Sequence, residues 1–169
     1  MRHRLDNAPI GNVLCRMEYE LLPWDPVPIF SDVVDSVSMA VVLEFDNGVR
    51  YRVHWVVWKE IECLDASDAD DPERNPFTRT EDVSSRWVDL IGSRLLAQRV
   101  AVQETNWGVQ PWACRFDFDQ ERRLVIALGE IVDGKPISYI PDNIVVTGSS
   151  ECAQAYRPPT AFSSAWVES

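Results

Sequence analysis

The sequence is poor in the residues that many enzymes use for acid–base and phosphate chemistry. Of its 169 residues, only two are histidines and seven are glycines. It contains no GxSxG, GxxxxGK[ST] or HExxH motif, the signatures of many serine hydrolases, nucleotide-binding proteins and zinc proteases. We therefore predict no catalytic residues, no metal and no cofactor. The sequence favours a protein that is not an enzyme, while a small hydrolase built from acidic residues and His54 stays open.

Cysteines are also few, and apolar runs are short. Cys15, Cys63, Cys114 and Cys152 are scattered without a CxxC spacing, so we expect buried thiols rather than disulfides or a zinc site. No apolar stretch approaches the roughly 18 residues of a membrane helix, and no apolar segment of a signal peptide follows the basic N-terminus. We expect a cytoplasmic protein that does not contact a membrane.

Basic charge is scarce as well. Lysine and arginine number 16 against 27 aspartates and glutamates, for a net charge of −11. Nucleic acids and anionic membranes bind basic surfaces, so neither is expected as a partner. Acidity of this degree keeps a small protein soluble, and it also attracts a basic protein partner. Both interpretations remain open from composition alone.

The clearest structural signal is a β-hairpin around Asn47-Gly48 in LEFDNGVRYRVHW. A two-residue loop would mix apolar and charged side chains on one face. A three-residue loop with Gly48 in the left-handed conformation separates them. The apolar pairs are then Phe45–Val49, Leu43–Tyr51, Val41–Val53 and Met39–Trp55. The pairs on the other face are Glu44–Arg50, Val42–Arg52 and Ala40–His54.

A second segment, WACRFDFDQERRLVIAL, repeats this pattern with Phe118, Phe116 and Cys114 in place of Phe45, Leu43 and Val41. On its return strand, Arg122, Leu124 and Ile126 take the places of Val49, Tyr51 and Val53. The preceding strands also match, sharing Ile-Gly at residues 10–11 and 91–92, and in the first of them Val13, Cys15, Met17, Tyr19 and Leu21 alternate with mostly polar residues. We predict an all-β fold with little helix, in which internally duplicated antiparallel β-meanders form one sandwich or a partly open barrel.

The predicted organisation is one compact domain with four segments. These are a first β repeat in residues 1–64, an acidic connector in 65–86, a second β repeat in 87–148, and a C-terminal tail in 149–169 that packs on the domain. The tail begins with a predicted short helix at residues 149–156. The connector lacks the glycine and distal glutamate of a calcium loop, so a solvated linker is expected there.

The predicted binding residues lie in the loops and the connector: Trp24, Trp107, Asp68, Asp70, Asp71 and Glu73. They favour a small bacterial protein-binding module, such as an immunity protein or inhibitor of a basic toxin or nuclease. The alternative is a β-barrel that binds a small ligand or carbohydrate through Trp24 and Trp107. The plainer expectation for both rings is that they fold back and plug an open end of the barrel. A homodimer through an edge strand is left open.

Overall fold

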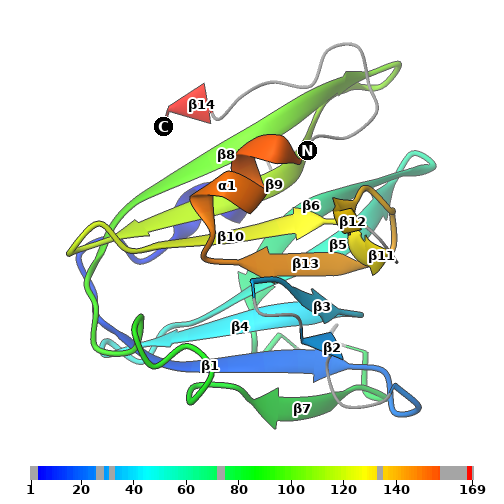
Figure 1. The fold of residues 1–169 in the computed structure, drawn as a ribbon. Helices are drawn as coiled ribbons and strands as arrows, with labels where there is room; N and C mark the ends of the chain where they lie inside the picture. Colours follow the sequence, from blue (N-terminus) through cyan, green and yellow to red (C-terminus); the bar gives the residue numbers. More distant parts are fainter. Residues whose placement is uncertain are drawn as a thin grey trace.

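The structure, a computed structural model, describes residues 4–25, 29–30, 33–71, 75–132, 135–156 and 167–168. Two antiparallel sheets pack as a β-sandwich (Figure 1). The five-stranded sheet has the order β6 (Ile61–Asp68), β5 (Arg50–Trp58), β4 (Ala40–Phe45), β1 (Leu14–Leu21) and β7 (Arg79–Asp82). The seven-stranded sheet has the order β14 (Val167–Glu168), β8 (Leu95–Thr105), β9 (Gly108–Phe118), β10 (Arg123–Leu128), β13 (Ile144–Thr147), β3 (Asp35–Val37) and β2 (Ile29–Phe30).

Three small elements complete the described part of the chain: a 3-10 helix at Arg4–Asn7, the separate pair β11 (Glu130–Val132) and β12 (Lys135–Ser138), and helix α1 (Ser150–Ala155). The Ser149 side chain caps α1 by accepting a hydrogen bond from the Cys152 amide. The all-β prediction is confirmed, and the architecture is a sandwich.

Both predicted hairpin registers are confirmed. In β4–β5, Leu43 pairs with Tyr51 and Glu44 with Arg50, and Gly48 has φ of +82°. Glycine reaches that conformation without the steric cost that other residues carry. The β9–β10 hairpin pairs Phe116 with Leu124.

The two sheets share a strand order, β1-β4-β5-β6 in one and β8-β9-β10-β13 in the other. The hydrogen bonds that join them are also matched: the Gly11 amide donates to the Leu95 carbonyl, and the Gly92 amide donates to the Leu14 carbonyl. Gly11 and Gly92 have nearly equal φ values, +90° and +86°. These features agree with the predicted repeat, while duplication of one ancestral unit stays a prediction.

Both predicted repeats carry a β-bulge near the start of their first strand, and it changes which side chains face inward. In β1 the register shifts between Leu14 and Arg16, so Leu14 is buried and Cys15 is exposed. The extra residue of a bulge reverses the alternation on one side of it. The prediction that the Cys15 thiol is buried was therefore wrong. An equivalent shift in β8 exposes Leu96.

The core lies between the sheets. Its largest fully buried side chains include Tyr19, Phe45, Trp112, Phe116 and Phe118. The rings of Tyr51 and Phe116 meet edge to face across the interface with centroids 6.1 Å apart. Each such side chain contributes about 1.5–3 kcal/mol by leaving water, so the sheets form a rigid frame for the outer faces and loops.

The acidic connector is partly sheet. β6 extends to Asp68, past the predicted end of the first repeat at residue 64. β7 lies inside the connector and pairs with β1, with Tyr19 opposite Glu81. Residues 65–68 and 79–82 are thus held by backbone hydrogen bonds rather than forming a linker.

Candidate functional site: a charged sheet face

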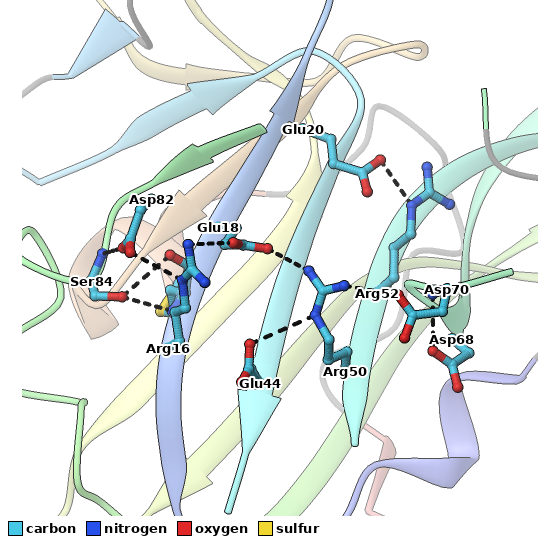
Figure 2. Close-up of polar contacts among 11 residues, drawn as sticks. Arg16, Glu18, Glu20, Glu44, Arg50, Arg52, Asp68, Asp70, Asp82 and Ser84 are labelled. Atoms are coloured by element: carbon cyan, nitrogen blue, oxygen red, sulfur yellow. Dashed lines mark hydrogen bonds and ion pairs between the residues drawn. The ribbon is translucent and has the colours of Figure 1, made fainter. Parts of the chain in front are cut away.

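The face of the five-stranded sheet that points away from the core carries a continuous ionic network (Figure 2). On β1, Glu18 accepts from Arg16 at 2.8 Å and from Arg50 of β5 at 2.6 Å. Arg16 also reaches Asp82 of β7 at 3.0 Å. The Glu18 side chain is 6% exposed, whereas Asp82 is 50% exposed. The network therefore has a buried carboxylate at its centre and an exposed one at its edge.

Arg50 is the hub of this network. Besides Glu18, it contacts Asp70 at 2.9 Å and Glu44 at 3.6 Å. Burial lowers the pKa of Arg50, but the hydrogen bond to Glu18 and the surrounding carboxylates outweigh this effect and raise it overall. The predicted Glu44–Arg50 pair is present, yet it is the longest of the three contacts. The shorter ones come from β1 and from the turn after β6, which the hairpin register alone does not place.

A second ion pair on this face is buried. The Arg52 Nε donates to a Glu20 carboxylate oxygen at 2.9 Å, and their side chains are 8% and 0% exposed. Two charges removed from water in this way must remain paired, because a single unpaired charge would be costly to bury. We interpret the pair as structural.

His54 lies on the same face, opposite Asp65 of β6. Burial and the nearby charge of Arg52 lower the pKa of His54 from 6.5 to about 4. Its ring Nδ1 lies 3.3 Å from the Trp55 carbonyl oxygen, which can only accept, so Nδ1 carries the proton in the neutral ring. A general base works best with a pKa near the working pH, so His54 is poorly suited to that role.

Of the predicted acidic residues, the structure brings two to the edge of the ionic network. Asp68 ends β6 and accepts a hydrogen bond from the Asp70 amide at 3.0 Å, while the Asp70 side chain pairs with Arg50. Asp71 follows in the same turn and donates its amide to the Asp68 carbonyl. Glu73 lies outside the described residues. Within the described part of the chain, no group of three or more His, Cys, Asp or Glu residues is placed to hold a metal ion.

The two predicted loop tryptophans are exposed, Trp24 by 75% and Trp107 by 53%. The expectation that both rings plug an end of the fold was wrong. Lys59 lies over the Trp107 ring at 5.2 Å and over the Trp58 ring at 5.8 Å, a cation–π arrangement that joins two hairpin tips. The loop after β1 and the tip of the β8–β9 hairpin lie at separate corners of the sandwich (Figure 1), so one small ligand would not contact both Trp24 and Trp107.

One buried polar cluster has no signal in the sequence. Asp35 of β3 is 0% exposed and accepts from the Tyr19 hydroxyl at 2.7 Å and from Arg86 Nε at 2.8 Å. Trp87 Nε1 in turn donates to the Tyr19 oxygen at 2.7 Å. Burial and the Asp35 charge raise the pKa of Tyr19 well above its usual value. The cluster joins segments far apart in the sequence, and we interpret it as a structural connection between the sheets.

Comparison of the chain with protein-family models, with curated proteins and with solved structures found no match. No helix in the described residues is long and apolar enough to cross a membrane.

Proposed function

We propose that this chain is a non-catalytic module that binds a basic protein, in the manner of a cytoplasmic immunity protein or an inhibitor of a basic toxin or nuclease. The observation that carries the proposal is the excess of carboxylates on the charged sheet face. We call this surface the acidic face. Its ionic network contains two arginines, Arg16 and Arg50, and four carboxylates, Glu18, Glu44, Asp70 and Asp82, and Asp68 adjoins this network at Asp70.

The burial of these groups supports an acidic outer surface. Glu18, which contacts both arginines, is only 6% exposed, whereas the side chains of Asp70 and Asp82 are 74% and 50% exposed. The arginines are therefore paired with carboxylates, and further negative charge faces solvent. Such a field accelerates encounter with a cationic protein and discriminates against acidic ones. Because the carboxylates are held on or beside sheet strands, little conformational entropy is lost on binding.

The test compares two variants of equal charge. One neutralises the acidic face with Asp68→Asn, Asp70→Asn and Asp82→Asn. The other neutralises three exposed glutamates elsewhere, with Glu104→Gln, Glu121→Gln and Glu151→Gln. Binding is measured by surface plasmon resonance against any basic protein encoded beside this gene, since inhibitors are commonly encoded next to their targets.

We expect the acidic-face variant to lose association rate and much of its salt dependence, while the control variant keeps both. Urea unfolding of each variant shows whether the fold is retained. Binding that is insensitive to salt, or equally weakened in both variants, would contradict the proposal.

The exposure of Trp107 favours a second candidate function, binding of a carbohydrate or other small ligand. Lys59 lies over the Trp107 ring, and the side chain is still 53% exposed, which leaves aromatic surface for stacking. Fluorescence titration with a sugar and metabolite panel tests it. A saturable change that Trp107→Ala abolishes and Trp24→Ala retains would support this candidate, and no saturable change would remove it.

A further inference from the structure

The outer face of the seven-stranded sheet carries an arginine cluster that the acidic-face proposal does not use. Arg99 of β8, Arg115 of β9 and Arg123 of β10 surround the single carboxylate of Asp117. Their Nε atoms lie 3.1, 2.9 and 3.5 Å from its oxygens, respectively. Three adjacent strands thus place their cations around one point.

This cluster gathers three positive charges around one carboxylate in a strongly acidic protein. Arg99 and Arg115 stand directly opposite each other on neighbouring strands, an arrangement that is destabilising for like charges unless an anion lies between them. Asp117 lies between them, and its carboxylate is shared by all three arginines.

A small hollow adjoins the cluster. It lies between the sheet and α1, and Arg115, Arg123, Gly148, Ser149 and Ser150 are among the residues that line it. Its volume of about 20 Å³ admits one water-sized group. The arginine guanidinium groups, the serine hydroxyls and the backbone N–H groups that line this hollow can donate hydrogen bonds to a single oxygen atom.

Arg123 is the arginine whose contacts leave it most available. Its guanidinium lies 3.5 Å from Asp117 and donates to the Ser150 hydroxyl at 3.4 Å, both long distances. Its side chain is 44% exposed, against 18% for Arg115. The Arg123 guanidinium therefore lies at the mouth of the hollow, and only weak contacts to Asp117 and Ser150 orient its N–H groups.

We propose that Arg115, Arg123 and Ser150 bind a tetrahedral oxyanion, a phosphate or sulfate group. One oxygen enters the hollow beside Ser150, and the others face Arg123 at the mouth. The planar guanidinium matches two oxygens of such a group at once. The narrow hollow excludes larger chemical groups. The site is on the opposite sheet from the acidic face and does not depend on the proposed function.

The test is a titration of the ¹⁵N-labelled protein with inorganic phosphate, with sodium chloride holding the ionic strength constant. We expect saturable chemical-shift changes confined to the amides of residues 148–151 and the Nε groups of Arg115 and Arg123. Arg123→Gln should weaken binding by about ten-fold or more, because it removes a charged hydrogen-bond donor. The matched control is Arg16→Gln, which changes an arginine of similar exposure, 46%, on the other sheet and should leave binding unchanged.

O-phosphoserine provides a second arm that identifies the source of the oxyanion. If O-phosphoserine binds more tightly than inorganic phosphate, the hollow binds the phosphate group of a larger molecule. If O-phosphoserine binds more weakly, the hollow binds the free ion. Shifts that rise linearly without saturation, equal shifts with acetate, or equal affinity in wild type and Arg123→Gln would overturn the proposal. The long contacts of Arg123 make loss of the fold in this variant unexpected, and its reference spectrum checks this directly.

Discussion

Acidification should destabilise this protein well above the pH at which its carboxylates protonate, and His54 is the reason. The folded protein holds the pKa of His54 at about 4, through burial and the charge of Arg52, whereas the unfolded chain has the ordinary value of 6.5. Between these two values the unfolded state binds more protons than the folded state. Stability therefore falls as the pH falls through this window.

The size of the effect follows from the pKa difference. Lowering from 6.5 to about 4 corresponds to about 3 kcal/mol in full, at roughly 1.4 kcal/mol per pH unit. About 2 kcal/mol of this is lost between roughly pH 7 and pH 5, where most aspartates and glutamates are still ionised. Because total stabilities of domains are about 5–15 kcal/mol, a loss of this size is readily measured.

The assay is urea unfolding followed by tryptophan fluorescence at both pH values, for the wild type and for His54→Gln. The variant lacks the titrating group, so it should lose less stability on acidification by about 2 kcal/mol. His3, the other histidine, is present in both proteins and cancels in the comparison. Equal pH dependence in the two proteins, or an NMR titration midpoint of His54 near its ordinary value, would refute the reasoning.

Three further predictions follow from buried and exposed groups. Arg52→Met should destabilise the fold by about 3–5 kcal/mol, because the Glu20 carboxylate stays buried without the arginine. Adding Glu20→Leu should recover much of this loss, which a double-mutant cycle measured by urea unfolding would show. Tyr19→Phe should cost about 1–3 kcal/mol, since its hydroxyl links Asp35 to Trp87, and no change in thermal unfolding would count against that link. Cys15 should react with a thiol reagent in the native protein, because its side chain is exposed. Cys114 should react only on unfolding, because it is buried and burial raises the pKa of its thiol. Simultaneous reaction of both thiols would contradict this prediction.

The hairpin registers were readable from the sequence because side-chain alternation in a strand has a period of two. For the hairpin with the Leu43–Tyr51 pair, only one register gives a face made entirely of apolar residues, and the structure has that register. The second hairpin follows the same pattern, with Phe116 opposite Leu124. The Ile-Gly pairs at residues 10–11 and 91–92 were also visible in the sequence, and both glycines adopt positive φ at matched junctions. Strand alternation and turn glycines depend on neighbouring residues in the chain, so the sequence shows them directly.

The bulges were not readable in this way. An inserted residue in β1 or β8 leaves no mark in the composition, so Cys15 was placed on the wrong face. The exposure of Trp24 and Trp107 was equally hidden, because a loop ring can turn inward or outward without any change in the sequence around it.

The sequence by itself determined the all-β class, the two hairpins and their registers, and the overall acidity. Only the tertiary structure decided which charges meet. Arg50 lies beside Glu18 and Asp70, and Arg99 lies beside Asp117, because segments that are separated along the chain become neighbours in a sheet. Electrostatic interactions depend on distance in space and on burial, whereas the alternation of a strand depends on neighbours in the chain. The acidic face and the arginine cluster therefore appear only when the sandwich is assembled.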